Sequence, residues 1–462
     1  MAEGDDGMAT ERDAGEGTKP QPIRGQMGST MMIGQNVPEE EENPSLLSPP
    51  GTDAGTMPNL KWPFSLSHTR LVTGGWARQV TVQELPVSKE IAGVDMRLKP
   101  GGIREMHWHK QSEWSFMLAG RARITAVDAL GRNFIDDVGE GDLWYFPKGV
   151  PHSIQGLEEG CEFLLIFDDG NFSENATFLI TDWFNHTPKD VLAKILGVPK
   201  HAFADLPKNI AKTRYVFAGK VPPALAKDAA AVKSPAGSVP TSFTYRMLAQ
   251  EPVRVPGGQV RIVDSINFPV STTIAAAHVT VDPGGARELH WHPTADEWQY
   301  YIRGHARMTV FGAEGKAVTY DYQAGDVGYV PFAMGSYIEN TGDGPMEFLE
   351  IFRSSRYGDI SLRQWMALTP PELVEATLNL SPGTMAALGK KKPLVVSGSV
   401  PDKGRRRAVV RRRPAASHVR ASEPGEAGGR RSDTRLAALN QLVVNTMSRL
   451  DDLSGDDEGG EG

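Results

Sequence analysis

The sequence predicts an all-β protein made of two tandem β-barrels with a few short helices, flanked by disordered tails. Three observations lead to this prediction. Short apolar runs separated by Gly, Pro and Asp turns fill the middle of the chain. A ten-residue segment that begins at Pro100 returns in closely similar form at Pro283. The two terminal segments hold too little apolar pattern to build a core of their own.

The predicted strands fall into two blocks of similar texture. They span 79–85, 114–118, 121–127, 143–146 and 163–167 in the first block, and 275–281, 298–302, 306–311, 327–330 and 348–352 in the second. Helical patterns follow the blocks at 188–196 and 362–368. Many short strands at this spacing favour a barrel or a sandwich over a mixed fold.

Charge and apolar content divide the chain into four expected regions. Residues 1–60 are acidic and expected to be disordered, with a net charge of −8 that equals the net charge of the whole chain. A first β-domain with a helical extension spans 61–235, and a second β-domain spans 236–392. Residues 393–462 form a low-complexity tail, basic and then acidic, with an amphipathic pattern at 435–453. The basic run can bind nucleic acid, but we interpret it as a solvated tail.

Composition also excludes several classes of protein. The single cysteine, Cys161, excludes an intramolecular disulfide and a thiolate metal cluster. No apolar run approaches the ~20 residues that a membrane helix needs. The N-terminus carries Glu3, Asp5 and Asp6 and lacks the apolar segment of a secretory signal. We therefore expect a cytoplasmic protein with no membrane partner.

The repeat extends well beyond its first ten residues. Residues 100–109 return at 283–292 with an offset of 183, and the offset becomes 184 from Glu113 and Glu297 onward. Gly120, Gly141 and Pro147 all keep the new offset in the second half. A register of this length predicts two copies of one β-domain.

The repeated residues indicate a metal centre. His107 and His109 lie two residues apart, so on a strand both imidazoles point to the same side. Glu113 follows after a short turn, and His152 can approach from a neighbouring strand as a fourth ligand. Imidazoles with one carboxylate suit Mn, Fe or a similar divalent ion, and four protein ligands leave octahedral positions open for substrate or dioxygen.

These residues match a known pattern. The spacings G-x5-H-x-H-x3-E-x6-G, from Gly101 to Gly120, and G-x5-P-x-G-x2-H, from Gly141 to His152, resemble the two motifs of the cupin superfamily. The second copy matches with Gly284, His290, His292, Glu297, Gly304, Gly325 and Pro331. Over about residues 64–392 the chain resembles the bicupin oxalate decarboxylases.

The resemblance implies both a fold and a function. The fold is two jelly-roll barrels, also described as double-stranded β-helices. The function is Mn2+-dependent conversion of oxalate to formate and carbon dioxide, with dioxygen as cocatalyst. Homo-oligomers, trimers or hexamers, are implied as well. The alternatives are an oxalate oxidase on the same scaffold, which yields peroxide and carbon dioxide, and a non-catalytic bicupin that binds or stores a ligand.

The resemblance also suggests catalytic residues. Arg104 and Arg287 lie three residues before each His-x-His pair, where the family binds a substrate carboxylate, and a guanidinium suits a dianion. In a regular strand three residues of separation would place each arginine on the face opposite its first histidine, so we expect the strand to be irregular there. Glu174, in Ser-Glu-Asn-Ala, matches the proton-transferring glutamate of the family's lid. Glu350 matches a second proposed proton donor, or is an acid that faces solvent or pairs with a base.

One residue departs from the pattern. The fourth ligand of the second cupin should follow Phe332-Ala-Met-Gly, but residue 336 is serine. Serine is a poor neutral ligand, so we expect His290, His292 and Glu297 to bind metal more weakly than the complete N-terminal set. The sequence therefore places the chemistry at the N-terminal cupin.

Overall fold

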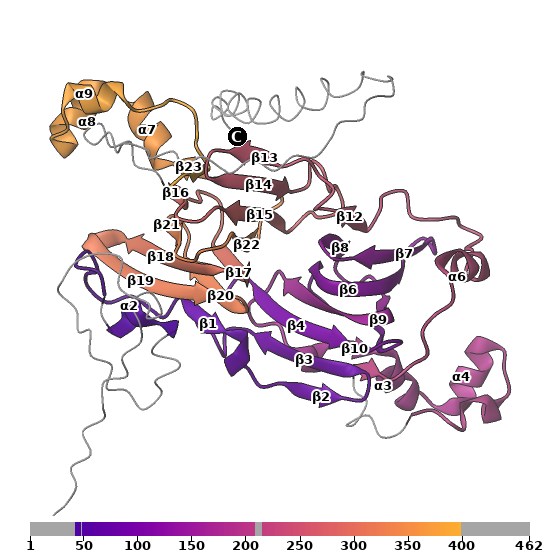
Figure 1. The fold of residues 1–462 in the computed structure, drawn as a ribbon. Coiled ribbons are helices and arrows are strands. Elements are labelled where there is room, and N and C mark those ends of the chain that lie inside the picture. Colours follow the sequence, from indigo (N-terminus) through magenta and orange to yellow (C-terminus); the bar gives the residue numbers. More distant parts are fainter. Residues whose placement is uncertain (1–41, 48, 208–214, 399–462) are drawn as a thin grey trace, which may run out of the picture. The chain divides into compact units, whose positions relative to one another are not determined.

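The computed structural model describes residues 42–47, 49–207 and 215–398 of the 462-residue chain. Its strands form two successive barrels, and short helices follow each of them (Figure 1). The all-β prediction is confirmed. No helix among the described residues is long and apolar enough to cross a membrane.

The first barrel is built mainly from the segment between residues 70 and 217. Its strands are β2 (Arg70–Val72), β3 (Gly75–Val80), β4 (Ala92–Leu98), β5 (Ile103–Trp108), β6 (Glu113–Val127), β7 (Asn133–Gly139), β8 (Asp142–Phe146), β9 (His152–Phe167), β10 (Phe178–Leu179) and β11 (Val216–Phe217). The long strands β6 and β9 pair with each other and connect the remaining strands of the sheet.

The second barrel repeats this plan with two sheets. Its strands are β13 (Val253–Val255), β14 (Gly258–Val263), β15 (Ala275–Val281), β16 (Ala286–Trp291), β17 (Glu297–Arg303), β18 (His305–Gly312), β19 (Lys316–Gln323), β20 (Asp326–Val330), β21 (Gly335–Asn340), β22 (Met346–Phe352), β23 (Ile360–Ser361) and β24 (Val395–Val396). One sheet runs from β14 through β15 and β22 to β17, and the other centres on β18, β21 and β16.

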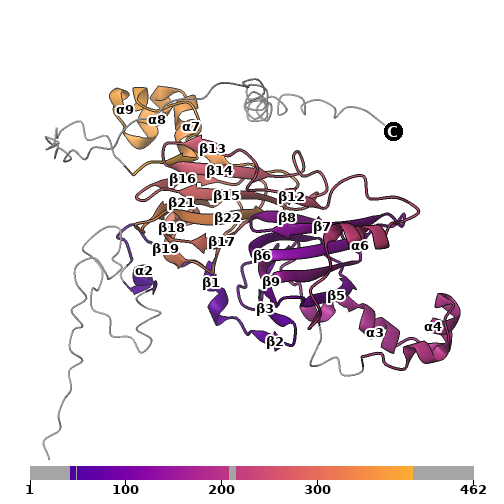
Figure 2. The same cartoon turned by 45° about the vertical axis from the view of Figure 1, so that its right-hand side comes forward.

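The helices are short and lie outside the barrels. They are α2 (Pro44–Leu47), α3 (Ile180–Asn185), α4 (Lys189–Leu196), α6 (Leu225–Ala231), α7 (Leu362–Leu368), α8 (Pro371–Leu378) and α9 (Pro382–Ala386). In Figure 2, α3 leads away from the first barrel toward α4, and α7 to α9 lie together beside the second. The helices predicted at 188–196 and 362–368 correspond to α4 and α7.

Each barrel receives one strand from the other half of the sequence. Strand β1 (Lys61–Pro63) precedes the first barrel but pairs with β20 of the second, where it lies indigo beside orange in Figure 1. Strand β12 (Thr244–Arg246) follows the first barrel's helices and pairs with β8 of that barrel. This exchange ties the two barrels together through backbone hydrogen bonds.

The two cupins also share an apolar core. Along β9, Phe163, Leu165 and Phe167 face the interior of the first barrel, whereas Leu164 and Ile166 face a core formed jointly with the second barrel. Both faces of β9 are therefore covered. This explains why its sequence reads as a continuous apolar run rather than an alternating one.

Two predicted strands differ from the structure in their boundaries. The run at 79–85 is strand only as far as Val80, because Glu84 accepts hydrogen bonds from the backbone N–H and the hydroxyl of Thr81 and closes a turn. The runs at 114–118 and 121–127 belong to one strand, β6. Between them Gly120 has a φ of +73°, which lets the strand bend without interruption.

Parts of both predicted tails lie against the second barrel. Ser45 donates its N–H to Asp321, Asp53 accepts from Thr319, and Ala54 forms a bridge with Ala317. At the other end, β24 pairs with β16. The folded part of the chain thus begins before the expected limit at residue 61 and continues past the expected limit at residue 392. Residues 1–41 and the pattern at 435–453 lie outside the described residues.

Strand β24 generates a test of where the C-terminal cupin ends. A chain that stops after Lys392 loses the buried side chain of Val395, whereas a chain that stops after Gly398 keeps it. We expect the shorter chain to be less stable by roughly 1.5–3 kcal/mol for that side chain alone. Urea unfolding of the two truncated proteins measures the difference, and equal midpoints would contradict the structural role of β24.

Candidate metal centres

Strand β5 carries the first site, and an irregularity in that strand gives it its shape. Arg104 pairs with Ile154 and His107 with His152, so β5 has one residue more than β9 between these two pairs. The same shift separates Arg287 from His290 in β16. A bulge of this kind brings both side chains to the barrel interior, although they are three residues apart. The expected irregularity is confirmed.

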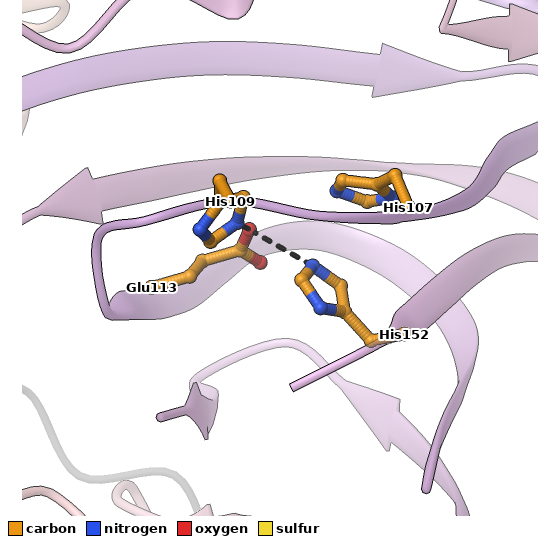
Figure 3. Close-up of side chains that lie close together, drawn as sticks. All are labelled: His107, His109, Glu113 and His152. Atoms are coloured by element: carbon orange, nitrogen blue, oxygen red, sulfur yellow. Dashed lines mark hydrogen bonds and ion pairs between the residues drawn. The ribbon is translucent and has the colours of Figure 1, made fainter. Parts of the chain in front are cut away.

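The first centre gathers its four side chains from three strands and one turn. His107 lies on β5, His109 just beyond it, Glu113 begins β6 and His152 begins β9. All four are buried, and one ligand atom from each lies within 4.8 Å of the others. Figure 3 shows the three imidazoles converging on the carboxylate. Glu113 Oε2 lies 3.1 Å from His109 Nε2 and 3.4 Å from His152 Nε2.

The backbone fixes which imidazole nitrogen points inward. The Nδ1 atoms of His107, His109 and His152 donate to the carbonyls of Glu105, Gln111 and Val150 at 2.6, 2.7 and 2.8 Å. Because a carbonyl only accepts, each Nδ1 carries a proton and each Nε2 is the nitrogen that faces the centre. Three inward-facing Nε2 atoms and a carboxylate inside a barrel fit a divalent cation.

Electrostatics supports this assignment. Burial, reinforced by Arg104 and the neighbouring histidines, holds the pKa of His107 well below its usual range. Burial also lowers the pKa of His152. Burial alone would raise the pKa of Glu113, but His152 and His109 hold it well below its usual range. Neutral imidazoles and an ionised carboxylate are the states that bind a metal ion.

The ligand carboxylate is positioned by its own neighbours. Trp144 on β8 donates its indole N–H to Glu113 Oε1 at 3.0 Å, and Ser115 donates its hydroxyl to the same atom at 3.4 Å. Oε2 is thereby left to face the histidines. Such outer contacts hold a ligand in the orientation the metal requires.

Arg104 places a buried guanidinium beside this centre. It is only 2% exposed, and within the described part of the chain its Nε and Nη1 have no hydrogen-bond partner. Its guanidinium lies 4.9 Å from the ring centre of Tyr215. Burial lowers the pKa of Arg104. A buried guanidinium with free donors is suited to receive an anion.

Glu174 lies at the same site, on the 3-10 turn Glu174–Ala176. Ser173 caps this turn by accepting from the Asn175 N–H. Glu174 is 4% exposed, and its Oε2 accepts from Arg70 Nη1 at 2.8 Å. Its Oε1 is buried and has no partner among the residues described. The turn therefore directs a carboxylate into the protein, next to Arg104.

The second centre repeats the first with one ligand fewer. His290, His292 and Glu297 are buried with their ligand atoms within 4.8 Å of one another. Ser336 pairs with His290 in the register in which His152 pairs with His107, so serine occupies the fourth ligand's position. Burial and the nearby Glu350 raise the pKa of Glu297 to about 8.

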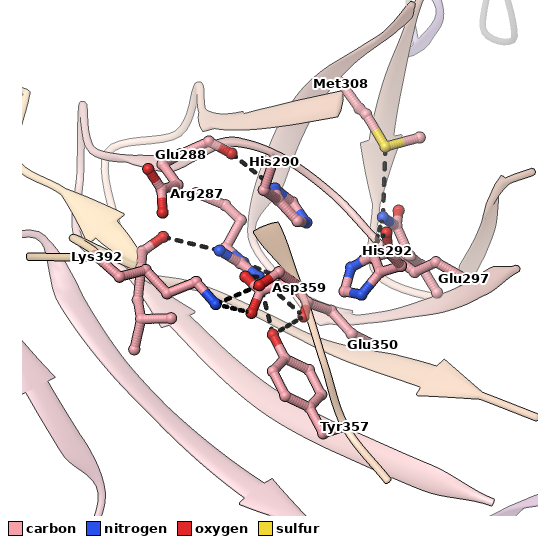
Figure 4. A network of polar contacts seen from close by, with 12 residues as sticks. Arg287, Glu288, His290, His292, Glu297, Met308, Glu350, Tyr357, Asp359 and Lys392 are labelled. Atoms are coloured by element: carbon pink, nitrogen blue, oxygen red, sulfur yellow. Dashed lines mark hydrogen bonds and ion pairs between the residues drawn. The ribbon is translucent and has the colours of Figure 1, made fainter. Parts of the chain in front are cut away.

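The arginine of the second centre is fully paired (Figure 4). Arg287 donates from Nε to Glu350 at 2.8 Å, from Nη2 to Tyr357 and Asp359 at 2.9 Å each, and from Nη1 to the Leu394 carbonyl at 3.1 Å. Burial opposes ionisation, but Glu350, Tyr357 and Asp359 hold the pKa of Arg287 well above its usual range.

Glu350 faces the barrel interior rather than solvent. It shares a face of β22 with Phe348 and Phe352, and its partner is Arg287. Of the alternatives that the sequence left open, the structure shows the paired acid. Arg287 and Glu350 thus hydrogen-bond to each other, whereas in the described part of the chain Arg104 and Glu174 share no hydrogen bond.

Several residues at these sites were not found from the sequence. Arg70 and Tyr215 border the first centre, and Tyr357, Asp359 and Lys392 border the second. They come from short edge strands and loops distant in sequence from the motifs. The sequence repeat does not reveal Tyr215 either. The equivalent residue of the second barrel, directly before β24 as Tyr215 is directly before β11, is Leu394, a different residue type.

The chain belongs to the cupin family, with two domains of that family in tandem. The family's sequence profile matches residues 66–202 and 246–386.

Individual relatives agree with this assignment. The chain is 58% identical over 377 residues to oxalate decarboxylase OxdC of Bacillus subtilis (strain 168), covering 82% of this chain and 97% of that protein. It is 44% identical over 375 residues to a probable oxalate decarboxylase of Arthroderma benhamiae, covering 80% and 91%.

Solved structures show the same similarity. The structure of Bacillus subtilis oxalate decarboxylase at pH 4.6 is 57% identical, with a TM-score of 0.78 over 82% of this chain and 98% of that one. A second structure of that enzyme, from a study of its Mn(II) centres, matches with the same identity and TM-score over 82% and 99%.

The serine in the second centre generates a reciprocal test. Ser336→His restores four ligands to that centre, and His152→Ser gives the first centre the ligand set of the second. We expect the first change to raise bound divalent metal from between about one and two per chain toward two, and the second to lower it. Elemental analysis after equal metal exposure measures both. Unchanged occupancy in Ser336→His would contradict the view that Ser336 weakens the second centre.

Proposed function

We propose that this chain is an oxalate decarboxylase that converts oxalate to formate and carbon dioxide at its N-terminal cupin. One observation carries the proposal: a four-ligand centre lies beside a buried guanidinium, two of whose donors have no partner among the described residues, and beside a buried carboxylate on a turn. The names of the relatives at 58% and 44% identity support the same activity.

The metal of this proposal is Mn2+. His107, His109, Glu113 and His152 hold it at the first centre, and a set of three imidazoles and one carboxylate suits that ion. When bound, the ion supplies an open coordination position for substrate and, with dioxygen as cocatalyst, one-electron chemistry. The study of Mn(II) centres in the Bacillus enzyme supports this choice.

Arg104 binds the substrate in this proposal. Oxalate carries two carboxylates, and a guanidinium can donate two parallel hydrogen bonds to one of them. Nε and Nη1 of Arg104, which have no partner among the described side chains and backbone groups, are available for that contact. Arg104 thereby orients the substrate and balances its charge.

Glu174 moves the proton. It removes the acid proton of hydrogen oxalate and returns it to the carbon that remains when the carbon–carbon bond breaks and carbon dioxide leaves. Hydrogen oxalate thus yields formate and carbon dioxide, with atoms and charge balanced. The burial of the Glu174 side chain, and its Oε1 that has no partner within the part of the chain described, support this role.

The second centre has a different task in this proposal. Arg287 and Glu350 form an internal pair that holds the barrel's interior together rather than binding oxalate. His290, His292 and Glu297 bind Mn2+ with lower occupancy because Ser336 supplies no imidazole. Catalysis therefore rests on Arg104 and Glu174.

Replacing the lid acid tests the proposed proton transfer. Glu174→Gln keeps the shape of the side chain and removes the titrating group. We expect formate production per bound Mn to fall by about a hundred- to ten-thousand-fold while Mn still binds. Formate, peroxide and metal are measured on the same preparation.

Glu350→Gln serves as the matched variant in the other cupin, and we expect a smaller loss. If Glu350→Gln abolishes formate production while Glu174→Gln leaves it intact, the assignment to the N-terminal cupin is wrong. Peroxide in place of formate from the unchanged protein would indicate an oxidase, in which oxalate, dioxygen and two protons give two carbon dioxide molecules and hydrogen peroxide. Neither product would indicate a non-catalytic bicupin.

We also propose a cytoplasmic homo-oligomer, a trimer or hexamer. Support comes from large apolar side chains at the surface of the described residues, among them Trp183 and Trp365 on the helices that follow the two barrels. Cys161 is buried as a free thiol, in keeping with a reducing compartment. Sedimentation equilibrium should give a mass of three or six chains, and a monomer at micromolar concentration would contradict the proposal.

A further inference from the structure

The first centre contains a contact that the duplication does not explain. Arg70 lies on the edge strand β2, far in sequence from every ligand and from the lid turn. Its Nη1 donates to Glu174 Oε2 at 2.8 Å across 104 residues of sequence. The arginine side chain is 34% exposed and the carboxylate side chain 5% exposed, so the arginine lies on the solvent side of the pair.

A second contact fixes the arginine itself. The Arg70 guanidinium lies 4.8 Å from the ring centre of Tyr215, and that of Arg104 lies 4.9 Å from it. The Tyr215 hydroxyl donates to the side-chain oxygen of Asn175, the residue after Glu174, at 2.9 Å. Arg70 and the lid turn are therefore joined both directly and through Tyr215.

The backbone shows that Tyr215 is held firmly in this place. Its φ is +75°, a conformation that is a genuine outlier for a bulky side chain. Its carbonyl accepts from the Glu105 N–H at 2.9 Å, and β11 pairs with β5 directly after it. Such a conformation persists only where surrounding contacts determine it. The ring thus provides a fixed platform for the arginine.

We propose that Arg70 is a positioning residue for the decarboxylation reaction: it holds one oxygen of Glu174 so that the other faces the substrate. This inference rests on the proposed role of Glu174. With Oε2 engaged by Arg70, Oε1 is the oxygen left to receive and return the proton. Without Arg70 the Glu174 carboxylate loses its hydrogen-bond donor, so it samples other positions and proton delivery to carbon becomes slower.

The second cupin lacks this device. There Arg287 takes Asp359, from the loop before β23, into its own set of bonds. In the first cupin the lid acid, Glu174, hydrogen-bonds to Arg70 instead, and in this proposal Arg104 binds the substrate. Arg70 therefore allows the two charged groups of the first site to remain apart.

The test measures formate and peroxide together at matched Mn content. Arg70→Gln should lower kcat for formate roughly tenfold, with KM for oxalate within about twofold, because the contact orients a proton donor and does not bind substrate. The peroxide fraction should rise, since a carbon left without its proton can give its electrons to dioxygen. Arg70→Lys keeps the charge but not the planar fork, and should recover part of the rate.

A matched control comes from the neighbouring strand. Arg78 on β3 makes a comparable pair with the buried Asp95, with an Nη2–Oδ2 distance of 2.8 Å, and the pair does not include the lid. Arg78→Gln removes a similar ion pair, so we expect lower thermal stability and an unchanged peroxide-to-formate ratio. A shift in that ratio equal to that of Arg70→Gln would show that any lost ion pair suffices, and would overturn the inference.

A double-mutant cycle separates this inference from the proposed function. If Arg70 acts through Glu174, Arg70→Gln adds little to Glu174→Gln, and the two effects are not additive. Full additivity would overturn the inference. If Arg70→Gln and Arg70→Lys both keep the normal rate while Glu174→Gln loses formate production, the proposed role of Arg70 is refuted and the proposed function stands. Retention of formate production in Glu174→Gln would refute the proposed function itself.

Discussion

One extra residue in a strand determines the geometry of both centres. Side chains of a regular strand alternate between faces, so Arg104 and His107, three residues apart, would point in opposite directions. The bulge between them, repeated between Arg287 and His290, brings each arginine and each histidine into the same barrel interior. The juxtaposition of a guanidinium with a metal centre, on which the proposed binding of a substrate carboxylate depends, follows from this bulge.

Given that geometry, the two barrels differ in how they balance the arginine charge. In the second barrel, Glu350 and Asp359 neutralise Arg287 inside the protein, and Lys392 contacts Asp359 in turn. In the first, the nearest carboxylate on the lid is engaged by Arg70, and Arg104 keeps two donors that no described residue fills. The same scaffold thus yields a closed ion-pair network in one half and a site open to an anion in the other.

These differences also mark the limit of what the sequence could predict. The ligands were found because each motif is local, with two histidines and a glutamate within seven residues in the first copy and eight in the second, and because the motif occurs twice. The fold class followed from the same repetition. Arg70, Tyr215 and Asp359 come from edge strands and loops whose positions depend on tertiary packing, which local periodicity does not encode. The strand exchange of β1 and β12 depends on packing between barrels for the same reason.

The way each barrel balances its arginine charge also explains why the histidine ligand is missing from the second centre and not from the first. Removing a partner from a buried charged group costs stability when it leaves that charge uncompensated. In the second barrel, Arg287 has carboxylate partners that do not depend on a bound metal, and the raised pKa of Glu297 lets that carboxyl stay protonated instead of being buried as an unpaired charge. In the first barrel, the centre's charges depend on one another, and His152 helps hold the pKa of Glu113 low. The loss of a ligand is therefore tolerated in the barrel whose ion pairs are self-sufficient, while the complete set remains where the proposed chemistry takes place.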